Sequence, residues 1–216
     1  MISVLLVDDH DLVRIGIGRM LDDVQGFKVV GEASSGEEAI SKARELQPNV
    51  VLMDIKMPGI GGLEATRKLT RVNPDIKVIA VTVCEEEPFP SRLLQAGAGG
   101  YITKGAPLDE MIKAIRVVHS GQRYISPEIA QRLALKPFKN EGAGSPFDIL
   151  SERELQIMIM VINCQKVQDI SDKLCLSPKT VNSYRYRIFE KLGVSSDVEL
   201  TLLAVRHGML DAEFVG

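Results

Sequence analysis

The sequence predicts an α/β domain built on a five-stranded parallel sheet, followed by a small all-helical domain. The first half of the chain alternates short Val- and Ile-rich runs with helical patterns, which is typical of a parallel sheet covered on both faces. The end of the chain has helical patterns and no strand pattern. A length of 216 residues is sufficient for two such domains.

The five predicted strands are short apolar runs, as expected for strands buried on both faces. They are residues 2–7, 27–33, 50–53, 76–82 and 99–103. Between them lie helical patterns, of which Val13, Ile17 and Leu21 on one stripe are an example. The connections between parallel strands are expected to be right-handed crossovers.

Residues 120–146 are predicted to be a linker that contains one short helix. The helix is expected to start at Ser126 and Pro127. The rest of this segment is rich in Lys, Gly, Pro and Asn and shows no periodicity, which is typical of a linker. The two domains are therefore expected to span residues 1–119 and 147–216.

Four short helices are predicted in the last domain. The segments that indicate them are residues 152–162, 167–174, 176–192 and 197–208. Ser151 and Glu154 have the spacing of a capping box before the first of these helices. Ser177 and Pro178 have the residue types that start a helix, so the third helix should begin there.

Composition excludes several classes of protein. No segment has the ~20 uncharged apolar residues that a membrane span needs, and the N-terminal residues do not have the pattern of a signal peptide. The expected location is therefore the cytoplasm. Cys84, Cys164 and Cys175 are not in a C-x-x-C spacing, so neither a disulfide framework nor a zinc site is expected. Each is predicted to be a small buried side chain.

Polar residues that could take part in chemistry lie at the ends of four predicted strands or directly after them. They are Asp8, Asp9, Asp54, Thr82 and Lys104. In a parallel sheet these strand ends lie on one edge, where ligands bind. In the flavodoxin-like strand order 2-1-3-4-5, strands 1 and 3 are neighbours, so the three aspartates are expected to converge.

Three carboxylates in one pocket repel one another, and a hard divalent cation such as Mg²⁺ removes that conflict. Asp8 and Asp9 are therefore candidate Mg²⁺ ligands, and Asp54 is a candidate nucleophile for phosphorus. Lys104 would offset the charge of a phosphoryl group. A purely structural alternative is that Asp9 or Asp11 caps the first helix.

The first half resembles the receiver domain of bacterial response regulators. The residues that carry the resemblance are "VDDH", "LMDIKMPGIGG", "VT" and "YITKG", and it covers about residues 1–119. The resemblance implies that Asp54 accepts a phosphoryl group from a sensor histidine kinase. It also implies an Mg²⁺ site made by Asp8, Asp9, Asp54 and the backbone carbonyl of Lys56.

The same resemblance implies that Thr82 and Tyr101 form a switch pair and that Lys104 contacts the phosphoryl group. One position departs from the family, because many receivers have proline where this sequence has Gly105. An enzyme is the alternative: haloacid-dehalogenase-like phosphatases also use an aspartate after a strand, with a second aspartate two residues later. That position is Lys56 here, so no enzymatic turnover is expected.

The third helix of the last domain carries a second group of candidate residues. At ~100° per residue, one face is apolar and forms the core side. It consists of Val181, Tyr184, Ile188 and Leu192. Lys179, Ser183, Tyr186 and Glu190 lie on the opposite face, flanked by Thr180, Asn182 and Arg187. Short polar residues beside basic ones are typical of a helix that enters the major groove of DNA.

The last domain resembles the LuxR-type helix-turn-helix DNA-binding domain. The residues that carry the resemblance are "LSERELQIM" and "DISDKLCLSPKTVNSYRYRIFEKLGV". It implies that Asn182, Ser183 and Tyr186 face bases, and that Lys179, Thr180, Arg187 and Lys191 face the DNA backbone. The family often has glycine where Cys164 stands, so we expect Asn163 to adopt the left-handed conformation at the end of the first helix.

Together the two halves resemble a transcriptional response regulator of a two-component system, closest to the GacA/UvrY subgroup, which is associated with activating genes for small regulatory RNAs. This implies a sensor histidine kinase, double-stranded DNA and RNA polymerase as partners, and a homodimer on activation. The alternative is a phospho-dependent protein-interaction module whose helical domain does not recognise DNA sequence.

Overall fold

The computed structural model describes residues 1–82, 89–135 and 145–209. The chain divides into two compact units, and the division falls between the second and third of these ranges. Within the described residues, no helix combines the length and the apolar character that crossing a membrane requires.

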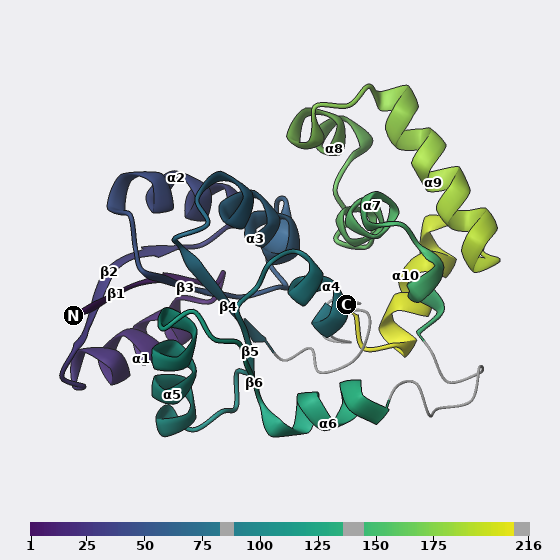
Figure 1. Cartoon of the computed structure of the whole chain (residues 1–216). Helices are drawn as coiled ribbons and strands as arrows, with labels where there is room; N and C mark the ends of the chain where they lie inside the picture. Colours follow the sequence, from purple (N-terminus) through teal and green to yellow (C-terminus); the bar gives the residue numbers. More distant parts are fainter. Residues whose placement is uncertain (83–88, 136–144, 210–216) are drawn as a thin grey trace. The chain divides into compact units, whose positions relative to one another are not determined.

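The first unit contains a six-stranded parallel sheet (Figure 1). Its strands are β1 (Ile2–Val7), β2 (Phe27–Ala33), β3 (Val50–Met53), β4 (Lys77–Thr82), β5 (Gly100–Thr103) and β6 (Tyr124–Ile125). Their order is β2-β1-β3-β4-β5-β6. The predicted order of the first five strands is therefore confirmed.

The sheet has one strand more than the five that the sequence predicts, namely β6. The backbone N–H groups of Tyr124 and Ser126 donate to the carbonyls of Gly99 and Tyr101, each at 3.0 Å. The short helix α6 (Pro127–Leu135) follows, and its Ile129 is completely buried. Residues of the expected linker thus add a strand and a helix to the first unit. A two-residue strand has no detectable alternation of apolar and polar residues, so the sequence pattern did not reveal it.

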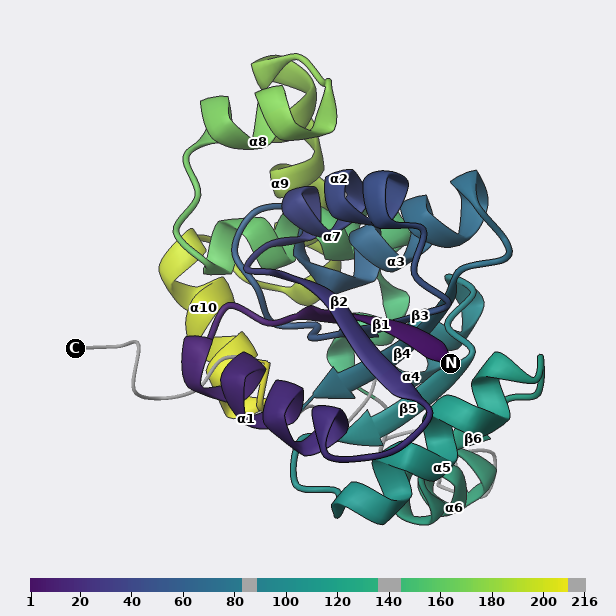
Figure 2. The same cartoon turned by 90° about the vertical axis from the view of Figure 1, so that its left-hand side faces the viewer.

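Helices cover both faces of the sheet (Figures 1 and 2). They are α1 (Asp11–Asp22), α2 (Gly36–Leu46), α3 (Gly61–Val72), α4 (Phe89–Gln95) and α5 (Leu108–His119). Val4 and Leu6 of β1 pack in the core with α1 and α5, whereas Leu5 and Val7 pack in the core with α2 and α3. Because side chains alternate along a strand, a continuous apolar run supplies both cores.

The second unit is helical. It contains a 3-10 turn (Pro146–Ile149) and the helices α7 (Glu152–Ile162), α8 (Val167–Leu174), α9 (Pro178–Leu192) and α10 (Asp197–Arg206). The capping box of Ser151 and Glu154 is present, and Ser177 caps α9 with Pro178 in the first turn. These predictions are confirmed. Leu155, Ile170, Val181, Ile188 and Leu200 form part of the core and are at most 1% exposed.

The cysteine prediction is wrong for two of the three residues. Cys164 and Cys175 are exposed, and Cys84 lies outside the described residues. Cys164 follows the end of α7 and Cys175 is the C-cap of α8, with φ values of 56° and 52°. Cys164 itself adopts the left-handed conformation that was expected of Asn163, whose φ is −83°. The left-handed position therefore coincides with the position where the resembling family often has glycine.

Candidate functional site

The predicted acidic residues meet at the carboxyl edge of the sheet. Val7 of β1 is paired with Met53 of β3, so the next residues, Asp8 and Asp54, lie side by side. The backbone N–H of Asp54 donates to the carbonyl of Val7 at 2.8 Å, which fixes this neighbourhood. At the ends of the neighbouring strands β4 and β5, the backbone N–H of Lys104 donates to the carbonyl of Thr82 at 3.0 Å.

Lys104 bridges the two buried carboxylates. Its Nζ lies 2.6 Å from Oδ2 of Asp8 and 2.9 Å from Oδ2 of Asp54. The other carboxylate oxygen of Asp54 accepts hydrogen bonds from the backbone N–H groups of Ile55, at 2.7 Å, and Lys56, at 3.3 Å. With Asp54 only 2% exposed, these contacts hold its carboxylate in one orientation.

The surroundings of Asp54 act on its pKa in opposite directions. Burial raises the pKa of Asp54 to about 6, while the ammonium of Lys104 counteracts the rise and the charge of Asp8 adds to it. Burial disfavours the charged form of Lys104, but the carboxylates of Asp54 and Asp8 nevertheless raise the pKa of Lys104 above its ordinary value. The positive charge of Lys104 therefore offsets burial and the charge of Asp8 only in part.

Four side chains at this edge have the arrangement of a metal site. Ligand atoms of Asp8, Asp9, His10 and Asp54 all lie within 4.8 Å of one another. Carboxylate oxygens in this number suit a hard divalent cation. His10 precedes the first residue of α1 as its N-cap, and its Nδ1 lies 2.9 Å from Oδ1 of Asp9. The structural alternative in which Asp9 or Asp11 caps this helix is therefore wrong.

Two supporting residues were not identified from the sequence. The Nη1 of Arg14 donates to the backbone carbonyl of Asp8 at 2.6 Å, so α1 supports the β1–α1 turn. Gly62 lies against the backbone of Asp54, and a Cβ at Gly62 would lie 1.9 Å from the carbonyl oxygen of Asp54. The Gly-Gly pair at positions 61 and 62 is the sequence signal for this close approach.

The predicted switch residues lie on adjacent strands. Thr82 ends β4 and is paired with Thr103, and Tyr101 is on β5 two residues before Thr103. Both Thr82 and Tyr101 are completely buried. Their roles as switch residues, and the Lys56 carbonyl as a metal ligand, stay predictions. At Gly105, where many receivers have proline, an added Cβ would meet no atom within 4 Å.

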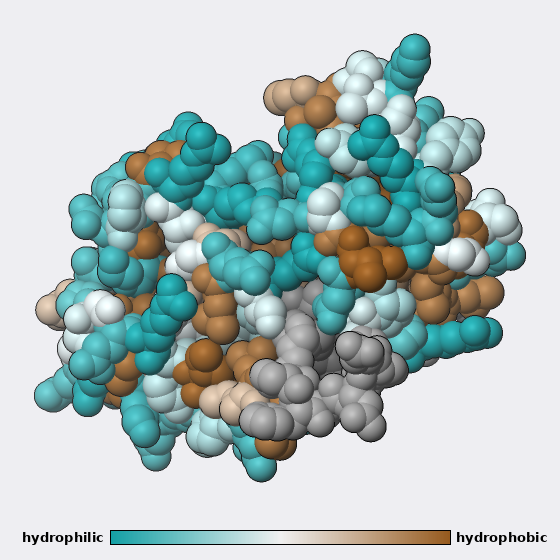
Figure 3. Space-filling view, turned by 45° about the vertical axis from the view of Figure 1, so that its right-hand side comes forward, coloured by the Kyte–Doolittle hydropathy of each residue, from teal (hydrophilic) through white to brown (hydrophobic). Residues whose placement is uncertain are grey.

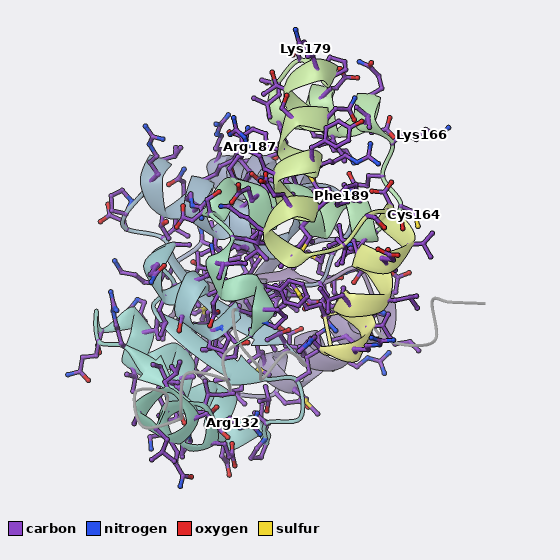
Figure 4. The ribbon with its side chains drawn as sticks, turned by 90° about the vertical axis from the view of Figure 1, so that its right-hand side faces the viewer. Arg132, Cys164, Lys166, Lys179, Arg187 and Phe189 are labelled. Carbon is purple, nitrogen blue, oxygen red and sulfur yellow. The ribbon has the colours of Figure 1, made fainter. Side chains whose placement is uncertain are left out.

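The second group of predicted residues lies on α9. Lys179, Ser183, Tyr186 and Glu190 are all exposed, as the helical wheel predicts, and Tyr186 is 71% exposed. Figure 3 shows hydrophilic and neutral residues over most of α8 and α9, with smaller hydrophobic areas. Figure 4 shows Lys179 at the N-terminal end of α9, with Arg187 and Phe189 farther along the helix.

Hydrogen bonds organise the start of α9. The hydroxyl of Ser177 accepts from the backbone N–H of Thr180 at 3.1 Å and lies 2.8 Å from the Thr180 hydroxyl. The hydroxyl of Ser183 donates to the carbonyl of Lys179 at 3.0 Å. Thr180 and Ser183 are thus engaged within the helix, and each hydroxyl oxygen can still accept a hydrogen bond.

Two basic residues of α9 are paired within the unit. The Nζ of Lys191 lies 2.7 Å from Oε2 of Glu154, which is buried on α7. Arg185 forms an ion pair with Asp197 at the start of α10. By contrast, Arg187 is exposed and its guanidinium lies over the ring of Tyr184. Lys179 and Arg187 are therefore the basic predicted residues that α9 presents to solvent without an acidic partner among the described residues.

Two family descriptions match this chain. Residues 4–116 match the response regulator receiver domain, and residues 148–204 match the luxR family of bacterial regulatory proteins. The response regulator GacA of Pseudomonas viridiflava is 74% identical over 212 residues, covering 98% of this chain and 99% of that protein. The response regulator UvrY of Escherichia coli is 60% identical over 213 residues, covering 99% and 98%.

Solved structures agree with the family matches. A LuxR-family two-component response regulator from Aurantimonas has 36% identity and a TM-score of 0.62, and the match covers 64% of this chain and 99% of that one. RcsB from Salmonella enterica, bound to a promoter, has 24% identity and a TM-score of 0.73, covers 94% and 98%, and supports the fold alone. This chain belongs to the response regulators that join a receiver domain to a luxR-type DNA-binding domain, in the group of GacA and UvrY.

Proposed function

We propose that Asp54 is the phosphoryl acceptor and that its phosphorylation activates DNA binding by the second domain. The observation that carries this proposal is the buried carboxylate of Asp54, held 2.9 Å from Lys104 and beside Asp8. An ionised oxygen of Asp54 attacks the phosphorus of a kinase phosphohistidine, and the phosphorus–nitrogen bond breaks. The imidazole keeps the electron pair and takes up a proton, while Lys104 offsets the charge of the transferred group.

The donor set at the pocket fits Mg²⁺. Asp8, Asp9 and Asp54 offer carboxylate oxygens, and we assign the fourth protein ligand to the backbone carbonyl of Lys56. Bound Mg²⁺ supplies positive charge to the phosphoryl oxygens. We further propose that the new phosphoryl group is sensed by the hydroxyl of Thr82 and by repacking around Tyr101.

Phosphoryl incorporation from radiolabelled acetyl phosphate tests this assignment. Asp54→Asn should abolish incorporation, and EDTA should suppress it in the unchanged protein. Asp75→Asn is the matched control, because Asp75 is an exposed aspartate in a turn of the same domain. Undiminished labelling of the Asp54→Asn protein would overturn the proposal.

We also propose that the chain is not an enzyme and that it retains the phosphoryl group as a signal. Lys56, whose backbone N–H contacts Asp54, stands where a haloacid-dehalogenase-like phosphatase has its acid. Lys56→Asp is therefore expected to shorten the half-life of the phosphorylated protein, whereas Lys56→Gln should not. Equal half-lives for the two variants would contradict this explanation of retention.

We propose that α9 is the recognition helix and that a dimer reads two half-sites of double-stranded DNA. Asn182, Ser183 and Tyr186 would contact bases, and Lys179, Thr180 and Arg187 would contact phosphates. The likeness to GacA and UvrY supports genes for small regulatory RNAs as targets, activated in the cytoplasm through RNA polymerase. Light scattering with and without acetyl phosphate tests the dimer.

The salt dependence of binding separates DNA recognition from the alternative, a protein-interaction module. DNA binding predicts that affinity for duplex DNA falls steeply as salt rises, because bound phosphates release counterions. Lys179→Ala should reduce the slope by about one per protomer. Lys173→Ala is the control, since Lys173 is an exposed lysine on α8 that contacts Gln165. A slope near zero for the unchanged protein would favour the protein-interaction alternative.

A further inference from the structure

Arg185 lies beneath the residues that are proposed to contact bases. It is half-buried on α9, with 23% of its side chain exposed, and its Nη1 donates to Oδ1 of Asn182 at 3.0 Å. Its guanidinium also lies over the ring of Phe189, with 6.0 Å between the guanidinium carbon and the ring centroid. Arg185 thus contacts neighbours on both sides along the helix.

The contact with Arg185 fixes which end of the Asn182 amide faces outward. A guanidinium has only donors, so the atom of Asn182 that faces it must be the carbonyl oxygen. The NH₂ group then lies on the side of the amide turned away from Arg185. Asn182 consequently turns its NH₂ donors toward DNA, while Arg185 occupies one of the two acceptor sites of its oxygen.

Phe189 contacts both Arg185 and the exposed Tyr186. The rings of Tyr186 and Phe189 meet edge to face, with centroids 6.5 Å apart and an interplanar angle of 89°. This geometry is favourable for aromatic pairs. Since Tyr186 is otherwise largely exposed, Phe189 restricts the positions that its hydroxyl can reach.

Asp197 anchors Arg185 from a different helix. Oδ2 of Asp197, at the start of α10, accepts from Nη2 of Arg185. The Arg185 Nε and Asp197 Oδ1 are buried and have no hydrogen-bond partner within the described residues, so a single hydrogen bond joins the pair. The charge of Arg185 is therefore offset inside the domain, and this side chain is not available as a phosphate contact.

We propose that Arg185, held by Asp197, is a positioning residue that sets base specificity by presenting Asn182 as a hydrogen-bond donor and by bracing Tyr186 through Phe189. This inference rests on the proposed role of α9 as the recognition helix. With its NH₂ group turned outward, Asn182 matches guanine and thymine, whose major-groove edges carry acceptors, better than cytosine, whose edge carries the N4 donor. The base contacted by Asn182 should therefore rarely be cytosine on the contacted strand.

Selection from randomised duplex DNA tests the proposal, using the full-length protein treated with acetyl phosphate. Asn182→Ala should remove the base preference at one position of each half-site. Arg185→Lys keeps the charge but loses the planar fork, and Asp197→Asn loosens the anchor. Both should weaken discrimination against cytosine at that same position by about fivefold, the size of one hydrogen bond. Neither should change the salt dependence of binding.

Arg187→Ala is the matched control, because Arg187 is an exposed arginine on the same helix. It should reduce the salt slope and leave the base preferences unchanged. Retention of the full preference by both the Arg185 and Asp197 variants, when Asn182→Ala has lost it, would overturn the positioning role alone. An unchanged preference for Asn182→Ala would refute base reading by Asn182 and the inference with it. Circular dichroism spectra of each variant verify that the domain remains folded.

Discussion

Replacing Asp54 with asparagine is expected to stabilise the first domain at neutral and alkaline pH. The pKa of Asp54 is raised by burial from 3.8 to about 6. At about 1.4 kcal/mol per pKa unit, the ionised carboxylate costs the folded state about 3 kcal/mol relative to its protonated form. Asparagine has the shape of the protonated acid and carries no charge, so it removes this cost.

The pH dependence of the effect follows from the sign of the shift. A carboxyl group whose pKa is raised on folding stabilises the folded state fully below its unfolded pKa, and this contribution is lost as the pH rises through about 6. The advantage of Asp54→Asn in the free energy of unfolding should therefore be small below about pH 4 and approach 3 kcal/mol at about pH 8. Other titrating groups are common to both proteins and largely cancel in the difference.

Urea unfolding in the presence of EDTA measures this difference at a series of pH values. Hydrogen-exchange mass spectrometry of β1 and β3 peptides assigns the change to the first domain, because strands of a central sheet exchange through global unfolding. Added MgCl₂ should stabilise the unchanged protein more than the variant. A difference that does not vary with pH, or an Asp54→Asn protein that is less stable at pH 8, would refute the reasoning.

Three other substitutions follow from single contacts. Gly62→Ala places a Cβ 1.9 Å from the backbone oxygen of Asp54, so the free energy of unfolding should fall by at least about 2 kcal/mol. The control is Gly105→Ala, which should lower it by less than about 0.5 kcal/mol. Urea unfolding measures both values. Cys164→Gly should be neutral or stabilise by up to about 1 kcal/mol, because glycine adopts the φ of 56° without strain; a clear loss of stability in urea would contradict this. Lys191→Ala should lower the free energy of unfolding of the second domain by about 1–2 kcal/mol at pH 7, since buried Glu154 keeps its hydrogen bond from Ser151 but loses its ion-pair partner. Burial raises the pKa of Glu154, but the contacts with Lys191 and Ser151 outweigh it and hold the pKa below its usual value. The loss of stability should therefore disappear as acid protonates Glu154. A loss that persists in acid would rule out the ion pair as its cause.

The strands and the phosphoryl-acceptor pocket were predictable because they depend on local patterns and one rule of topology. Apolar runs located the first five strands to within one residue at each end. Since parallel strands end on one edge, the residues after β1, β3 and β5 had to meet, and Asp8, Asp54 and Lys104 do so. The supporting contacts of Arg14 and Gly62 were not predictable, because they depend on the path of each turn and not on residue type.

The conformation at the end of α7 shows where reasoning by residue type fails. Asparagine tolerates the left-handed conformation better than cysteine does, so Asn163 was the natural choice. The structure places Cys164 there instead, one residue later, because the N–H groups of Cys164 and Gln165 close the helix end on the carbonyls of Val161 and Met160. The hydrogen bonds and packing of a helix set where it ends. The residue that then lies at the left-handed position adopts this strained backbone conformation, whatever its type.

The charge on α9 is a different case, because a helical wheel locates side chains but not their partners. Four basic residues lie on α9, and two of them are paired with acids that are distant in the sequence. Arg185 is paired with Asp197, 12 residues later, and Lys191 with Glu154, 37 residues earlier. Their charges are offset inside the domain, so Lys179 and Arg187 are the basic residues of α9 that have no acidic partner among the described residues. This division explains how a domain with more acidic than basic residues can still carry local positive charge on one helix. If α9 is the recognition helix, as proposed, the paired cations would fix the helix, and the two unpaired ones would supply the electrostatic attraction for DNA.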